Sequence, residues 1–115
     1  MAKIQTSVTV PVQSHDEARK KLMLHLGNMG AKLVSETQQQ ITLKRGSQAK
    51  MRILGFLAKD KDFPVLAHIV FDTNNPQQVL VNVLESMVVG TTLGVRDKYQ
   101  RSCTEFAQLI AQALQ

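Results

Sequence analysis

The sequence predicts a single α+β domain over residues 1–115, with one antiparallel sheet and a long C-terminal helix packed on it. Three observations favour this fold class. The chain has 115 residues, of which 43% are hydrophobic, so it is long enough to bury one sizeable core. Strand-like alternation begins near Lys3 and returns over residues 31–86, whereas residues 95–113 follow a helical period. The predicted order of elements is β-α-β-β-β-β-α.

The first predicted strand covers residues 3–12, where apolar and polar side chains alternate. Pro11 has no backbone N–H to donate, so it should lie at a sheet edge or at the end of the strand. A helix is expected to begin at Ser14, because Ser14 and Glu17 have the spacing of a capping box. The apolar stripe predicted for this helix consists of Ala18, Leu22, His25, Leu26 and Met29.

Residues 31–86 predict four strands connected by short turns, at residues 31–45, 49–58, 64–72 and 78–86. The turn signals are Gly46-Ser47, the polar residues 59–62 before Pro64, and residues 73–76. Links this short favour antiparallel neighbours. Alternation weakens at residues 38–40, where we expect a bulge or a bend.

The last predicted element is a helix from about Val95 to Ala113. Asp97 lies near its start, where a negative charge complements the helix dipole. The predicted apolar stripe consists of Val95, Tyr99, Cys103, Phe106, Ile110 and Ala113.

Residue parity predicts which strand side chains share a face, because a one-residue slip in register moves every side chain to the other face. The odd-numbered face is apolar and is expected to support the helices. It carries Ile41, Leu43, Met51, Ile53, Leu57, Val65, Ala67, Ile69, Phe71, Val79, Val81 and Val83. The even-numbered face carries the apolar residues Leu54, Phe56, Leu66, Val70, Leu80 and Leu84. The polar residues among them are Lys44, Lys50, Arg52, His68 and Asn82.

The same register aligns residues across the predicted hairpins. The expected pairs are Thr42 with Arg52, Lys44 with Lys50, Leu54 with His68, Phe56 with Leu66, His68 with Asn82, and Val70 with Leu80. Like charges directly opposite each other are unfavourable unless they are solvated or neutralised by an anion. Lys44, Lys50 and Arg52 therefore form a candidate anion-binding corner.

The even-numbered face is too apolar to be left in water, so we expect it to be covered. One possibility is that the two helices take opposite faces of the sheet, which would leave no apolar surface for function. The other possibilities are a ligand between the sheet and the second helix, a homodimer through sheet faces, and a nucleic-acid surface.

The composition indicates a basic protein of a reducing compartment. Fourteen Lys and Arg against nine Asp and Glu give a net charge of +5, which favours anionic partners. The N-terminus lacks the apolar region of a signal peptide, and the apolar run at residues 63–71 is too short to span a bilayer. The single cysteine, Cys103, has no internal partner for a disulfide. We expect a cytoplasmic protein without a membrane span.

No combination of residues predicts catalysis. His15 and His25 lack the spacing of a zinc-binding helix, and His25 is interpreted as a core or boundary residue. In the predicted register, His68 lies near Arg52 and Asn82. We interpret His68 mainly as a structural hydrogen-bonding residue, with a role in ligand or partner binding as the alternative. Cys103 is interpreted as a small buried residue rather than a nucleophile. We expect no catalytic residues, no metal and no cofactor.

Two loops contain part of a known ligand-binding motif but lack residues that the motif requires. Residues 60–62 begin like a calcium loop, but Phe63-Pro64 replaces the required glycine and the downstream glutamate is missing. Residues 90–94, before the second helix, offer backbone amides to an anion near Arg96, yet lack the lysine of a P-loop. We interpret the first as a turn and the second as a linker or hinge.

The predicted order β-α-β-β-β-β-α resembles the topology of TATA-binding-protein-like repeats and, with extra strands, of helix-grip lipid-binding domains. The resemblance extends over nearly the whole chain and rests on element order, not on a sequence motif. For the first group it implies a sheet face that contacts a partner. For the second it implies a C-terminal helix, here residues 95–113, that closes a cavity against the sheet. Fold similarity alone does not assign a function.

Three hypotheses for function follow. The first is a non-enzymatic binding module that uses the even-numbered face for homodimerisation, a protein partner or a small apolar ligand. The second is binding of nucleic acid or another polyanion through the same face. The residues expected to contact the anion are Lys44, Lys50, Arg52 and Asn82, and Phe56 offers a stacking or wedging surface. The third is an enzyme without a recognisable motif.

Overall fold

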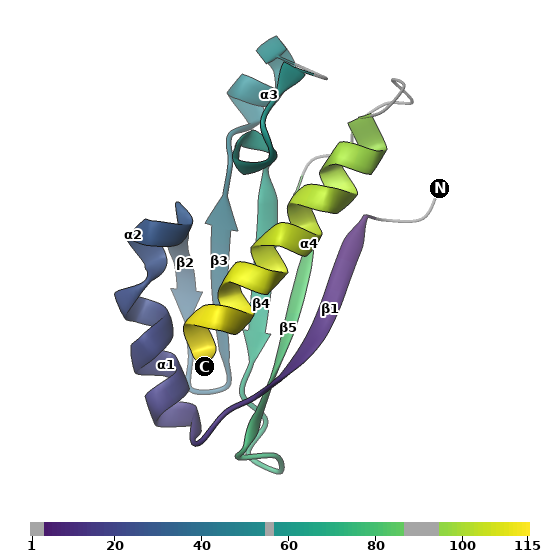
Figure 1. Ribbon diagram of the computed structural model, residues 1–115. Helices are drawn as coiled ribbons and strands as arrows, with labels where there is room; N and C mark the ends of the chain where they lie inside the picture. Colours follow the sequence, from purple (N-terminus) through teal and green to yellow (C-terminus); the bar gives the residue numbers. More distant parts are fainter. Residues whose placement is uncertain (1–3, 55–56, 87–94) are drawn as a thin grey trace.

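The computed structural model describes residues 4–54, 57–86 and 95–115, and it contains one antiparallel sheet with helices on one side (Figure 1). The five strands are β1 (Gln5–Pro11), β2 (Lys32–Glu36), β3 (Gln40–Arg45), β4 (Val65–Val70) and β5 (Gln78–Glu85). Their order in the sheet is β1-β5-β4-β3-β2. The helical elements are α1 (His15–Leu24), α2 (Leu26–Met29), α3 (Gln48–Leu54), the 3₁₀ helix η2 (Asp60–Asp62) and α4 (Val95–Leu114). The predicted α+β class is confirmed.

Helix α1 begins where the capping residues predict. The Ser14 side chain accepts a hydrogen bond from the backbone N–H of Glu17 at 3.1 Å. The helix ends at Leu24, and the short α2 ends at Gly30, whose left-handed φ of 67° closes it. His25, at the junction, is exposed, so its predicted place on the buried stripe is wrong. The reason is that the regular helix stops before residue 25 and turns the following side chains to new directions.

The predicted strand over residues 31–45 is two strands, β2 and β3, joined by a tight turn. In this turn the Thr37 hydroxyl oxygen accepts from the backbone N–H of Gln40 at 3.0 Å. The weakened alternation at residues 38–40 therefore marks a hairpin turn. A register shift does occur in β2, between Leu33 and Ser35, as a β-bulge.

The predicted strand over residues 49–58 is wrong for its described residues, because residues 48–54 form helix α3. This segment is rich in Ala, Lys, Met, Arg and Leu, which favour a helix. Ser47 supports the start of the helix, where its hydroxyl oxygen accepts from the backbone N–H of Lys50 at 3.2 Å. Met51 is buried, but Ile53 and Leu57 are 82% and 67% exposed and do not belong to the sheet core.

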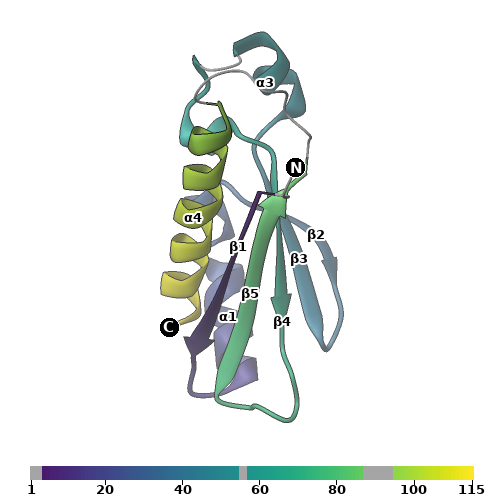
Figure 2. The same cartoon turned by 90° about the vertical axis from the view of Figure 1, so that its right-hand side faces the viewer.

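Helix α4 lies across β1 and β5, and α1 lies beside it on the same side of the sheet (Figures 1 and 2). Every residue of its predicted apolar stripe is buried, from Val95 to Ala113. The Tyr99 hydroxyl donates a hydrogen bond to the Pro64 carbonyl oxygen, which joins α4 to the start of β4. The alternative in which the two helices cover opposite faces is therefore wrong.

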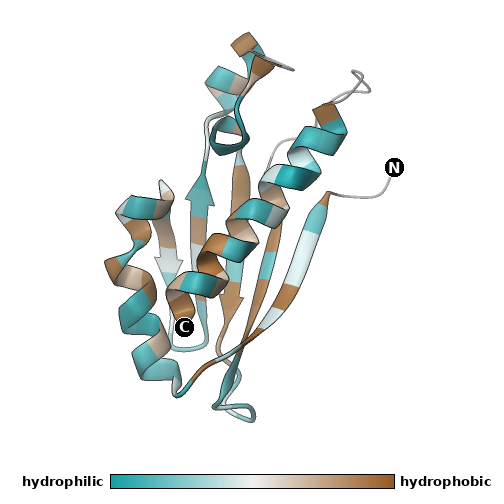
Figure 3. Cartoon of the chain, viewed as in Figure 1, coloured by the Kyte–Doolittle hydropathy of each residue, from teal (hydrophilic) through white to brown (hydrophobic). Residues whose placement is uncertain are grey.

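The side of the sheet under the helices, called here the covered face, contains the core. Eight aliphatic side chains of β3, β4 and β5 are fully buried on this face, and Figure 3 shows hydrophobic residues along the strands behind α4. They are Ile41, Leu43, Val65, Ala67, Ile69, Val79, Val81 and Val83. The predicted odd-numbered parity of this face is correct for all of them.

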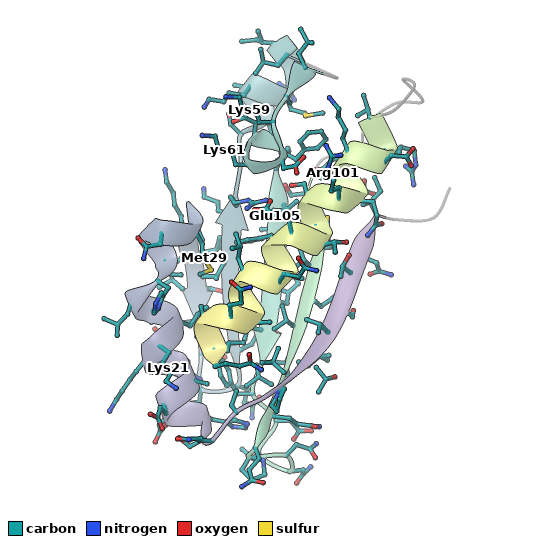
Figure 4. The ribbon with its side chains drawn as sticks, viewed as in Figure 1. Lys21, Met29, Lys59, Lys61, Arg101 and Glu105 are labelled. Atoms are coloured by element: carbon teal, nitrogen blue, oxygen red, sulfur yellow. The ribbon has the colours of Figure 1, made fainter. Side chains whose placement is uncertain are left out.

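The end of β3 is fixed by a buried arginine. The Arg45 guanidinium lies 3.0 Å from a Glu105 carboxylate oxygen and 3.2 Å from the Ser102 hydroxyl oxygen, both on α4. It also lies 4.6 Å from the centre of the Phe106 ring. Figure 4 shows Arg101 on α4 near the end of the molecule that carries Lys59 and Lys61, and Glu105 farther along the helix.

Gly46, the next residue, completes this junction. Its φ is 90°, and a Cβ there would lie 2.1 Å from the Phe63 carbonyl oxygen, so only glycine fits. Ser47 then donates its backbone N–H to the Asp62 carbonyl oxygen at 3.0 Å. The chain therefore changes from strand to helix within two residues, at a fixed position beside the start of β4.

Candidate functional site

The face of the sheet opposite α1 and α4 is covered by none of the described helices, and we call it the open face (Figure 2). Helix α3 lies beyond the end of the sheet rather than over it (Figure 2). The register places the following side chains on the open face: Gln5, Ser7, Thr9, Lys32, Ser35, Gln40, Thr42, Lys44, Leu66, His68, Val70, Leu80, Asn82 and Leu84.

The centre of the open face consists of two aliphatic pairs separated by a polar pair. Leu66 lies opposite Leu84, His68 opposite Asn82, and Val70 opposite Leu80. The last two pairs match the register predicted from sequence. All six side chains are partly accessible, and Leu80 is 44% exposed. The centre is therefore less apolar than the covered face but still presents four aliphatic side chains to solvent.

The polar residues at the centre form a hydrogen-bonded row. His68 Nδ1 lies 3.1 Å from Gln40 Nε2 and 3.2 Å from the Thr42 hydroxyl oxygen. An amide nitrogen can only donate, so His68 Nδ1 accepts in this contact and the ring N–H is on Nε2. On the other side of the row, the Ser7 hydroxyl donates to Asn82 Oδ1 at 2.9 Å.

Two donor groups of this row have no partner within the described part of the chain. They are the Nε2 of His68 and the Nδ2 of Asn82, on residues directly opposite each other. The acceptor atoms beside them, His68 Nδ1 and Asn82 Oδ1, are already bonded. The centre of the open face therefore offers hydrogen-bond donors framed by aliphatic side chains.

One end of the open face is basic. Lys44 on β3 lies opposite Lys32 on β2 and opposite Leu66 on β4. Both lysines are exposed, and among the described residues neither forms an ion pair. A concavity of about 490 Å³ lies between them and the start of α3, and its other lining residues include Ser47, Gln48 and Ser86.

The predicted corner of Lys44, Lys50 and Arg52 is not formed. Lys50 lies on α3, where its ammonium group is 3.6 Å from an Asp62 carboxylate oxygen, and Arg52 is exposed on the same helix. The predicted pairs of Lys44 with Lys50 and of Thr42 with Arg52 are wrong because residues 48–54 are helical. Thr42 instead lies opposite His68.

The six predicted apolar residues are also divided. Leu66, Val70, Leu80 and Leu84 share the open face, whereas Leu54 lies on α3 and is 38% exposed. The predicted pairing of Leu54 with His68 is therefore wrong. Phe56 lies outside the described residues, as do residues 90–94.

Lys32 belongs to the basic end but was not predicted there. The sequence feature that could have predicted the position of Lys32 is the turn at residues 37–39. A chain that reverses direction there places residue 32 opposite residue 44. Ser7, Gln40 and Thr42 were missed as partners of Asn82 and His68 for a related reason. Their contacts depend on which strands are neighbours, and the position of β1 beside β5 is a long-range pairing.

Among the residues that the structure describes, the remaining reactive side chains form no second candidate site. Cys103 is fully buried, and burial, reinforced by the negative charge of Glu85, raises the pKa of its thiol to about 11. Across residues 4–54, 57–86 and 95–115, His, Cys, Asp and Glu side chains form no group of three or more that could hold a metal ion. No described helix has both the length and the apolar character needed to cross a membrane.

Comparisons of the chain with protein-family models, curated proteins and solved structures gave no match. The predicted resemblance to TATA-binding-protein-like and helix-grip topologies therefore stays a prediction.

Proposed function

We propose that this chain is a non-enzymatic binding module whose open face receives an amphipathic, acidic segment of another protein. The observation that carries this proposal is the combination of uncovered aliphatic pairs, unpartnered donors and unpaired lysines on one face. Each group specifies a property of the partner, namely an apolar surface, hydrogen-bond acceptors and negative charge.

The aliphatic pairs supply the driving force. Leu66, Leu84, Val70 and Leu80 lie on adjacent strands and remain accessible. Burial of about 200 Å² of apolar area at about 25 cal/mol per Å² contributes about 5 kcal/mol before the entropy costs of association. A partner segment with aliphatic side chains on one side supplies the matching surface.

The polar pair at the centre of the open face, His68 and Asn82, favours a partner with hydrogen-bond acceptors. A partner that covers His68 Nε2 and Asn82 Nδ2 must bond to them, because a buried donor without a partner costs about 1–3 kcal/mol. Backbone carbonyl groups or carboxylates satisfy both groups. A partner that presents only donors is rejected at this position.

The charge of the open face favours an acidic protein over a second copy of the chain. The face carries Lys32 and Lys44, and none of its residues is Asp or Glu. A second copy would bring the same two cations and no carboxylate to the interface. The net charge of +5 also assists the approach of an anionic partner.

The other hypotheses have less support in the described residues. The open face has no Phe, Tyr or Trp among its described residues, and its single imidazole, His68, is a small stacking surface, which disfavours single-stranded nucleic acid. A ligand between the sheet and α4 would have to displace Tyr99, Cys103 and Phe106, which are fully buried.

The test uses two synthetic amphipathic peptides of equal length and apolar content, one with glutamates and one with lysines. Backbone amide chemical shifts of the labelled protein should change on β3, β4 and β5 with the acidic peptide and remain unchanged with the basic one. Leu80→Ser should weaken binding, whereas Leu24→Ser should not, because Leu24 is 78% exposed on α1. Equal binding of both peptides, or shifts confined to the helices, would overturn the proposal.

Two further measurements separate the other occupants. Sedimentation that detects a dimer, with Leu80→Ser restoring the monomer, would assign the open face to a second copy. Salt-dependent binding of duplex or single-stranded DNA that is lost with Leu80→Ser would assign it to nucleic acid.

A further inference from the structure

The lysines at the basic end of the open face form an unusual pair. Lys32 and Lys44 lie directly opposite each other on β2 and β3. Two like charges in directly opposite positions destabilise a sheet. Arg45 and Lys50, the next two cations along the chain after Lys44, have carboxylate partners within 4.0 Å. Among the described residues, Lys32 and Lys44 have none. Their charges are left for solvent or for an anion from outside the chain.

The concavity between these lysines has the composition of an anion site. Its volume is about 490 Å³, and its described lining contains no Asp or Glu. Ser47, Gln48 and Ser86 add neutral polar groups. Arg45 also lines it, but its charge is already matched by Glu105 at 3.0 Å. The uncompensated charge of the concavity is therefore that of the two lysines.

Three consecutive lining residues of the concavity, at positions 45–47, are held in place by the surrounding fold. Gly46 is fixed against the Phe63 carbonyl oxygen, and Ser47 is bonded to the Asp62 carbonyl oxygen at 3.0 Å. Arg45 ties the end of β3 to α4. A ligand entering here meets a largely preformed site, which lowers the ordering cost of binding.

We propose that this concavity binds a phosphoryl group, carried by a phosphorylated side chain of the partner segment that occupies the open face. A phosphoryl group has a charge of about −1.5 to −2 at neutral pH and three acceptor oxygens, which match two ammonium groups and several neutral donors. A carboxylate carries a single charge and leaves one lysine unmatched.

The position of the concavity connects it to the open face. Leu66 belongs to both, as a member of an aliphatic pair and as part of the lining of the concavity. A segment lying across the aliphatic pairs therefore has its end beside Lys32 and Lys44. The source of the phosphoryl group rests on the proposed function, whereas the concavity can be tested alone with inorganic phosphate.

The first experiment titrates the full chain with inorganic phosphate and, at matched ionic strength, with acetate. Phosphate should cause saturable amide shifts at residues 30–32 and 44–48, and acetate should bind at least about tenfold more weakly. Lys32→Gln combined with Lys44→Gln should reduce phosphate affinity about tenfold or more. The matched control is Lys20→Gln on α1, an exposed lysine away from the concavity, which should leave the affinity unchanged. Shifts that do not saturate, or that survive in the double variant, would overturn the phosphoryl site.

The second experiment compares an acidic amphipathic peptide containing serine with the same peptide containing phosphoserine. Tighter binding of the phosphoserine form, lost in the Lys32→Gln, Lys44→Gln variant, supports the proposal. Equal binding of both forms overturns the phosphoryl site but leaves the proposed function standing. If phosphate binds while neither peptide does, the proposed function and the protein source of the phosphoryl group both fail.

Discussion

Strand β4 presents two different surfaces within six residues. Towards the helices it places Val65, Ala67 and Ile69, each 0% exposed, and towards the open face it places Leu66, His68 and Val70, each partly accessible. Strand β5 repeats the contrast, with fully buried Val81 on one side and Leu80, 44% exposed, on the other. The covered side of β4 is uniformly aliphatic and that of β5 is aliphatic up to Glu85, whereas the open side of both strands alternates aliphatic and polar residues.

This contrast separates the residues that determine the fold from those available for binding. The covered face is closed by α1 and α4 and has no accessible donor among its β4 and β5 side chains. The open face keeps free donors and unpaired cations, which contribute little to the stability of an isolated chain. Substitutions on the two faces should therefore have unequal effects on folding and on binding.

The largest expected effect is a loss of stability on the covered face. Ile69→Ala should lower the free energy of unfolding by about 2–5 kcal/mol, because it removes buried methyl groups and leaves a cavity. Val70→Ala, the adjacent residue on the open face, should lower it by less than about 1 kcal/mol. Urea denaturation measures both values, and equal losses would contradict the division of the sheet into two faces.

A smaller effect concerns the pH dependence of stability. The pKa of the Cys103 thiol is raised from 9.0 to about 11 in the folded chain, so between these values the folded state holds a proton that the unfolded state has lost. The contribution of Cys103 to stability is therefore complete below pH 9 and falls as the pH rises from 9 towards 11. Denaturation curves across this range should show a steeper decline for the natural chain than for Cys103→Ala, and parallel declines would contradict the raised pKa.

The smallest effect should be a gain in stability on the open face. Lys32→Glu replaces a like-charge pair with an opposite-charge pair across β2 and β3, which should add about 0.2–1 kcal/mol at low salt. The same variant should abolish binding of phosphate at the concavity. Urea denaturation with and without added salt checks the first outcome, and unchanged stability at low salt would show that the two lysines do not interact.

Local patterns predicted those parts of the fold that depend on neighbouring residues. The capping spacing of Ser14 and Glu17 gave the start of α1, and the helical period gave the buried side of α4. Parity correctly placed Leu66 and Leu80 on one face, and the link at residues 73–76 gave the correct register of β4 with β5. These predictions succeed because a turn and its flanking strands are set by short-range geometry.

Local patterns failed where two structures share a similar apolar pattern. Met51, Ile53 and Leu57 alternate as in a strand, but the helix-forming residues among them and the Ser47 cap favour α3 instead. That error gave Lys50 and Arg52 the wrong partners. The pairing of Lys32 with Lys44 was missed for a different reason, because residues 31–45 were predicted as one strand. The placement of both helices on one face depends on tertiary packing, which alternation along one strand does not encode.

The bulge in β2 bears on whether the sheet of one molecule can pair, edge to edge, with the sheet of another. An edge strand with regular spacing is a template on which another chain can extend the sheet and so start aggregation. In β2 the register shift between Leu33 and Ser35 interrupts that template, and in β1, the other edge strand, Pro11 contributes no N–H. Growth by edge-to-edge pairing is therefore discouraged at both edges of the sheet.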